Sequence, residues 1–123
     1  MNEPPPPERP HRFYRLIAGP RATAKDFLSH EASGFPLKAK PTAADVASWR
    51  AVSTFTSEDA LRERALEARR YGRPETLLRE YIAVLDVPDG SLIAVGRISR
   101  TGHCDLTADP QVLLAAVVNV IPV

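Results

Sequence analysis

The chain has 123 residues, a length that fits one domain able to bury a modest core. Its formal net charge is +1, with 25% charged and 44% hydrophobic residues, so composition gives no general attraction to nucleic acid or to an anionic membrane. The single cysteine, Cys104, excludes an internal disulfide and a cysteine-based zinc site, and fits a reducing cytoplasm.

The N-terminal stretch MNEPPPPERP is polar and rich in proline, unlike the apolar stretch of a signal peptide. We expect residues 1–11 to form a disordered leader and residues 12–123 to form a single domain. No apolar run approaches the roughly 20 residues that a membrane-spanning helix needs. The frequent alanine, arginine and proline residues are typical of a GC-rich bacterial genome.

Alternation of side chains in RFYRLIA (12–18) predicts a first strand. Thr23 and Asp26 are spaced as a capping box, which predicts a helix that ends at Gly34. Thr42 is expected to begin a second short helix.

The stretch from Ala51 to Gly72 reads as a short strand that runs directly into a helix. Residues 52–56 are β-prone, and Ser57 is a helix N-cap followed by two acidic residues that suit the positive end of the helix dipole. PETLLRE (74–80) is ambiguous, with one helical turn as its best interpretation.

The C-terminal third is expected to hold the centre of the sheet. YIAVLDV (81–87) is continuously apolar and predicts a central strand, and a Pro-Asp-Gly turn then leads to 91–99 as its hairpin partner. Asp109 should cap a short helix, and VVNVIPV (117–123) should be the last strand. The predicted fold is therefore α+β, with a mixed or antiparallel sheet, about three to four short helices and the order β-α-α-β-α-β-β-α-β.

The predicted core consists of apolar residues from all of these elements. They are Phe13, Leu16, Ile17, Phe27, Leu28, Trp49, Phe55, Leu61, Ala65, Ile82, Val84, Leu85, Ile93, Leu113, Leu114, Val118 and Val120.

Hydroxyl groups gather at the strand-to-helix junction, from Ser53 to Ser57. They either cap the helix or line a pocket, and capping is the more common role. Alternation separates Ser53 and Phe55 from Thr54. If Phe55 points into the core, Thr54 is the better ligand candidate and Ser53 the better structural residue.

Arg15 stands in an otherwise apolar and aromatic strand. It either reaches the sheet edge or points into a cleft, where a guanidinium can hold a phosphate or carboxylate, and we favour the structural role. RTGHCD (100–105) is expected to be a loop that brings His103 and Asp105 together, a setting where functional groups gather. Cys104 has no evident activating base.

For the other charged residues and the histidines, structural or solvated roles are the favoured interpretation. The helix arginines are offset by acidic neighbours and indicate a solvated face. The histidines at positions 11, 30 and 103 are too widely spaced to predict a metal site, and there is no phosphate-binding glycine loop or nucleophile elbow.

The motif order resembles that of small ADP-ribosyltransferase-like domains. In that family an early strand carries an Arg or His that holds NAD, here FYRLI with Arg15, and a second strand bears a Ser-Thr-Ser-like signature, here STFTSEDALRERA with Ser53 and Thr54. The resemblance covers about 13–99 and implies NAD as cofactor. The order also resembles that of small uncharacterised bacterial proteins. No glutamate follows Glu80, so the late catalytic glutamate of the family is missing.

Three hypotheses follow, and they leave open whether the protein is an enzyme. The first is a cytoplasmic binding or regulatory protein on a catalytically degenerate scaffold, with a protein partner or a nucleotide-like ligand. The second is an active NAD-dependent transferase or toxin, in which Arg15, Ser53 and Thr54 hold NAD and His103 or Asp105 assists. The third is an antitoxin or immunity protein that acts through an exposed apolar patch.

Overall fold

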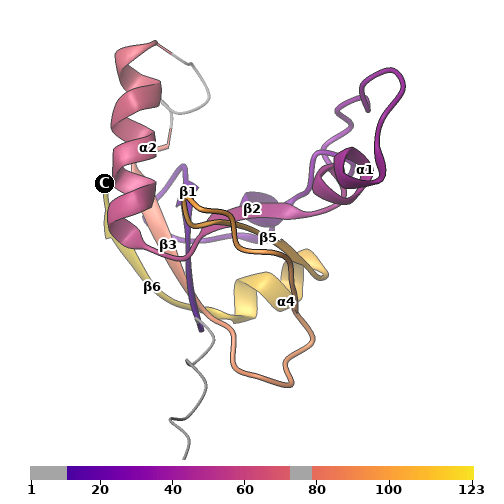
Figure 1. Cartoon of the computed structure of the whole chain (residues 1–123). Helices are drawn as coiled ribbons and strands as arrows, with labels where there is room; N and C mark the ends of the chain where they lie inside the picture. The colour runs from indigo at the N-terminus through magenta and orange to yellow at the C-terminus, as the bar shows by residue number, and fades with distance from the viewer. Residues whose placement is uncertain (1–10, 73–78) are drawn as a thin grey trace, which may run out of the picture.

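The computed structural model describes residues 11–72 and 79–123. One six-stranded sheet organises this part of the chain (Figure 1), and every strand pairing in it is antiparallel. Its spatial order is β4-β5-β2-β1-β3-β6. The strands are β1 (Arg12–Ile17), β2 (Val52–Phe55), β3 (Tyr81–Asp86), β4 (Ala94–Val95), β5 (His103–Thr107) and β6 (Val117–Pro122).

Three α-helices and one 3-10 helix accompany the sheet in the described residues. They are η1 (Ala24–Phe27), α1 (Ala43–Trp49), α2 (Glu58–Arg70) and α4 (Pro110–Ala115). Thr42, Ser57 and Asp109 cap the three α-helices, each by accepting a hydrogen bond from a backbone N–H of the first turn. The α+β class and these helix starts are confirmed.

Three parts of the predicted element order are wrong. The capping box of Thr23 and Asp26 forms, but it starts only the short η1, because the backbone is already extended at Leu28. β3 does not pair with the residues after the 88–90 turn; it lies between β1 and β6, and β4 pairs with β5. The predicted loop RTGHCD instead leads into β5, which adds a strand to the expected order.

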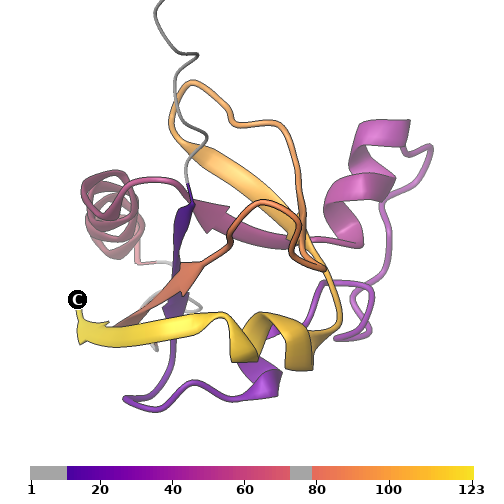
Figure 2. The same cartoon turned by 90° about the horizontal axis from the view of Figure 1, so that it is seen from below.

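The sheet buries apolar residues on both faces, as alternation along β3 shows. Ala83 and Leu85 belong to the main core together with Phe27 of η1 and Leu113 of α4. The buried residues Ile82 and Val84 alternate with them and lie outside that core cluster. Leu61, Ala65 and Ala68 form the buried stripe of α2, which contacts β1 and β2 and stands apart from α4 (Figures 1 and 2).

Ten of the predicted core residues are buried, and the others are half-buried or exposed. Val118 is exposed because a bulge in the β3–β6 register lies beside it, between Val84 and Leu85. The half-buried positions are Leu16, Leu28, Trp49, Phe55, Leu114 and Val120. The predictions for the leader at 1–10 and for residues 74–78 lie outside the described residues.

Candidate functional site

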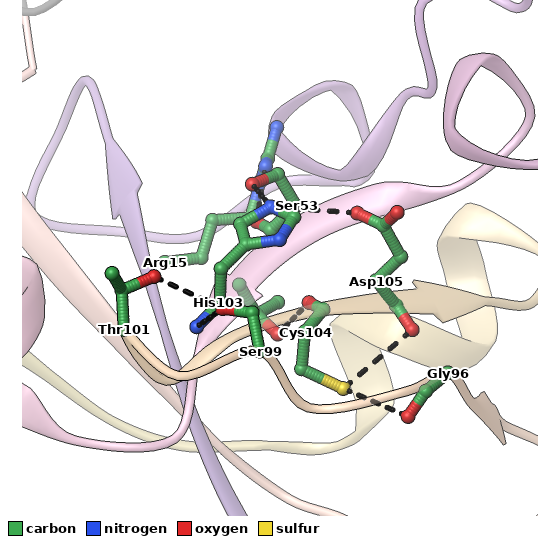
Figure 3. A network of polar contacts seen from close by, with 9 residues as sticks. Arg15, Ser53, Gly96, Ser99, Thr101, His103, Cys104 and Asp105 are labelled. Carbon is green, nitrogen blue, oxygen red and sulfur yellow. Dashed lines mark hydrogen bonds and ion pairs between the residues drawn. The ribbon is translucent and has the colours of Figure 1, made fainter. Parts of the chain in front are cut away.

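The candidate site forms where β2 and β5 lie side by side (Figure 3). In this pairing Ser53 is directly opposite Asp105, and Phe55 is directly opposite His103. Because side chains alternate along a strand, these four residues share one face of the sheet. The other face at this point carries Thr54 and Cys104, both buried.

His103 is at the centre of this group, and two oxygen atoms hold its ring. Ser53 Oγ lies 2.7 Å from Nε2, and Asp105 Oδ1 lies 3.5 Å from the same nitrogen. The ring of Phe55 meets the imidazole edge-on, with 5.6 Å between the ring centroids. The imidazole is therefore fixed in orientation while more than a third of its side chain remains exposed, at 37%.

These contacts do not build a Ser-His-Asp catalytic triad. In a triad the acid holds one ring nitrogen and the nucleophile contacts the other. Here the Ser53 hydroxyl and the Asp105 carboxylate both approach Nε2, so they compete for one nitrogen. The contacts orient the imidazole of His103, and Ser53 and Asp105 act as positioning residues.

A pocket of about 330 Å³ opens between this sheet face and α2. Phe55, Thr101 and His103 line it from the sheet side, and Ala60, Glu63, Arg64 and Glu67 line it from the helix. Ser53 and Asp105 are not among the lining residues, which fits their role in holding His103 from behind. The charged groups in the lining are two carboxylates, Glu63 and Glu67, and one guanidinium, Arg64.

The turn before β5 sets the rim of the pocket at Thr101. Ser99 Oγ lies 3.0 Å from Thr101 Oγ1 and accepts a hydrogen bond from the His103 N–H at 3.1 Å. Gly102 has a φ of 84°, and an added Cβ would come within 3.1 Å of Thr56 Oγ1. Glycine at this position therefore allows the turn to lie against the start of α2.

Arg15 does not reach this pocket. Its Nε donates to the Asp26 carbonyl at 2.8 Å and its Nη1 donates to the Ser53 carbonyl at 2.7 Å. The only β1–β2 register pair is Tyr14 with Phe55, and β1 and β2 cross steeply (Figure 2), so the guanidinium joins η1 to β2 where the two strands diverge. Burial, with the neighbouring Arg79 charge, lowers the pKa of Arg15 to about 10, and the group remains charged at neutral pH.

Thr54 is not placed as the ligand residue that the sequence predicted, and Ser53 is not in the pocket lining either. Thr54 is 1% exposed, and its hydroxyl donates to the Cys104 carbonyl at 2.6 Å, whereas the Ser53 side chain is exposed beside His103. Cys104 Sγ donates to the Gly96 carbonyl. Burial, and secondarily the Asp105 charge, raises the pKa of its thiol, which keeps it protonated and unreactive.

The structure thus brings together three of the five predicted site residues: Ser53, His103 and Asp105. Sequence reasoning missed the contribution of Phe55 and of the α2 residues. Glu63 and Glu67 are four residues apart on a helix, a spacing that places both on one face. That spacing was visible in the sequence, but nothing local indicated that this face meets β5.

Within residues 11–72 and 79–123, no group of three or more histidine, cysteine, aspartate or glutamate side chains is placed to hold a metal ion. Over the same residues, no helix combines the length and apolar character required to cross a membrane. No protein-family model, curated protein or solved structure matches this chain. The resemblance to ADP-ribosyltransferase-like domains therefore rests on the quoted sequence motifs alone.

Proposed function

We propose that this chain is a small binding protein and that the pocket between α2 and β5 is its ligand site. The observation that carries the proposal is the fixed imidazole of His103 at a concave surface, held from behind by Ser53 and Asp105. Pockets in which a few oriented polar groups converge beside an aromatic ring are typical of small-ligand sites.

The lining favours a nucleoside-like ligand. The Phe55 and His103 rings offer surfaces for a planar base, and the Glu63 and Glu67 carboxylates accept hydrogen bonds from sugar hydroxyls. Arg64 is the one arginine or lysine in the lining, and its Nη1 already lies 3.9 Å from a Glu67 carboxylate oxygen. A diphosphate such as that of NAD would meet two carboxylates at this site, so a neutral nucleoside fits better than a charged nucleotide.

The NAD-dependent transferase remains the alternative, and the contact between Ser53 and His103 is the observation that favours it. Two features weigh against it. Arg15 is bound to backbone carbonyls outside the pocket. The carboxylates that line the pocket come from α2 rather than from the late strand or loop that the resemblance requires.

The test is a series of melting curves with adenosine, AMP, ADP-ribose and NAD, because a ligand that binds only the folded state raises the melting temperature. We expect adenosine to raise it most. His103→Ala should weaken adenosine binding by about tenfold, the cost of one lost hydrogen bond. His30→Ala is the matched control, since His30 also contacts a phenylalanine ring, Phe35, at a 5.3 Å centroid distance, and does not line the pocket.

Two outcomes would contradict the proposal. One is the absence of any shift with all four compounds. The other is an equal loss of binding in the His103 and His30 variants. Stabilisation by NAD that Arg15→Ala abolishes would instead support the transferase alternative.

A further inference from the structure

The two edges of the sheet differ in how well they are closed. At the β6 edge, Pro122 has no N–H, and its carbonyl accepts a hydrogen bond from Arg62 Nη2 at 3.1 Å. The Val120 N–H donates to the side chain of Asn119 at 2.9 Å. Two of the backbone groups that a neighbouring strand would need are thus already occupied, as expected of a protected edge strand.

The β4 edge is only two residues long, Ala94 and Val95, and within the described residues no side chain caps its outward backbone groups. The Gly96 N–H donates inward to the Asp105 carbonyl of β5 at 2.8 Å. In an antiparallel pair the backbone groups of successive residues point alternately toward and away from the partner, so those of Val95, the residue before Gly96, point outward. Gly96 also permits this close pairing, since an added Cβ would lie 2.9 Å from the Asp105 carbonyl oxygen.

A pocket of about 310 Å³ lies along this free edge. All of its lining residues belong to the stretch from Val87 to Ile98, and none belongs to β5, so the pocket lies between β4 and the connection that leads into it. The buried side chains of Val87 and Ile93 contribute to its lining. Ile98, after β4, is 40% exposed at the pocket, and Leu92, in the connection before β4, is 84% exposed.

The charged side chains from residue 91 to residue 100 are all basic. Residues 91–100 contain Arg97 and Arg100 and no acidic residue. Neither arginine has an ion-pair partner within the described part of the chain. Asp89 lines the far end of the pocket. We propose that the β4 edge accepts an extended segment of a partner protein as a seventh strand, with apolar side chains in the pocket and acidic side chains against Arg97.

A second copy of this chain is the less suitable occupant. Pairing two β4 edges would add the two arginines of each copy to one surface, and residues 91–100 contain no acidic residue to offset them. A partner strand with acidic side chains would supply the negative charge that residues 91–100 lack. Its backbone hydrogen bonds would give affinity, and the pocket would select alternate side chains.

The probe is a blocked hexapeptide of alternating glutamate and valine, titrated into the full chain and followed by backbone amide NMR shifts. We expect the shifts to concentrate at Val95 and Arg97. The same peptide with N-methylated backbone amides should not bind, because it cannot pair as a strand. Arg97→Glu should weaken binding by roughly two- to fivefold. Arg70→Glu, a like change on the exposed side of α2, should leave it unchanged.

A peptide of alternating lysine and valine sharpens the test, because it should bind the Arg97→Glu variant better than the original chain. The proposal is overturned if the lysine peptide binds the original chain equally well, or if N-methylation has no effect. It is also overturned if the amides of 94–98 shift with protein concentration alone, which would identify a second copy as the occupant.

Discussion

Thr54 and Ser53 are neighbours in β2, but their hydroxyls have different partners and different exposure. The Thr54 hydroxyl is buried and donates to the Cys104 carbonyl, whereas the Ser53 hydroxyl contacts His103 at the surface. Thr54→Val keeps the shape of the side chain and leaves a buried hydrogen bond unmade, so we expect a loss of about 1–2 kcal/mol in unfolding free energy. Ser53→Ala should change it by less than about 0.5 kcal/mol. Urea denaturation of both variants measures the difference, and a larger cost for Ser53→Ala would contradict it.

From the sequence, the separation of the two side chains could be predicted, but not which of them is buried. Alternation correctly separates Ser53 from Thr54, but the choice of the buried side depended on Phe55 pointing into the core. Phe55 is only half-buried, because its ring packs against His103 at the pocket. Phenylalanine usually marks the inner face of a strand, and where the ring lines a pocket this inference fails.

Among the elements, α1 depends on a capping box whose acid group responds to pH. The Asp45 carboxylate accepts a hydrogen bond from the Thr42 N–H and pairs with Lys38, and these contacts lower the pKa of Asp45 to about 2 from the ordinary 3.8. A lowered pKa in the folded state means that this stabilisation is present above pH 3.8 and is lost as the pH falls through about 2. We expect α1 to loosen in that interval.

Trp49 reports this transition, because it is the last residue of α1 and its Nε1 donates to the Phe35 carbonyl. Its emission should move to longer wavelength between pH 4 and pH 2, the interval set by the Asp45 pKa. Asp45→Asn should remove this step. Asp59→Asn, which removes a carboxylate from the first turn of α2, should leave it in place. A step that survives in Asp45→Asn would show that another group causes it.

The elements that the sequence predicted well are those with local signals. Thr42, Ser57 and Asp109 each accept a hydrogen bond from an N–H within three residues, so their neighbours alone determine the helix start. The predicted hairpin of 81–99 failed because β3 instead pairs with β1 and β6, and no short-range pattern reports that choice.

The strand at the candidate site had a signal that the loop interpretation overlooked. From His103 to Leu106 the side chains alternate between half-buried and buried, which is the period of a strand. Gly102 and the polar residues His103 and Asp105 favoured a loop instead. A strand that faces a pocket carries polar residues on its accessible side, so the features that made β5 look irregular are the features of the candidate site.

At the scale of the whole molecule, long-range pairing decides which apolar residues are inside. β1 contacts β3 about 70 residues further along the chain, and β2 contacts β5 about 50 residues further, so the core assembles only when the sheet does. Leu85 lies opposite Phe13 in this arrangement, and both are fully buried. Val118 lies at the β3–β6 bulge with 54% of its surface exposed.

Leu85 and Val118 therefore give the last prediction, since the sequence placed both in the core. Leu85→Ala leaves a cavity between β1 and the helices and should lower the unfolding free energy by roughly 2–5 kcal/mol. Val118→Ala removes atoms that already contact water and should lower it by less than about 0.5 kcal/mol. Equilibrium urea unfolding, followed by far-UV circular dichroism, gives both values from one kind of experiment. Equal costs for the two variants would mean that β6 packs in a different register, with Val118 turned inward.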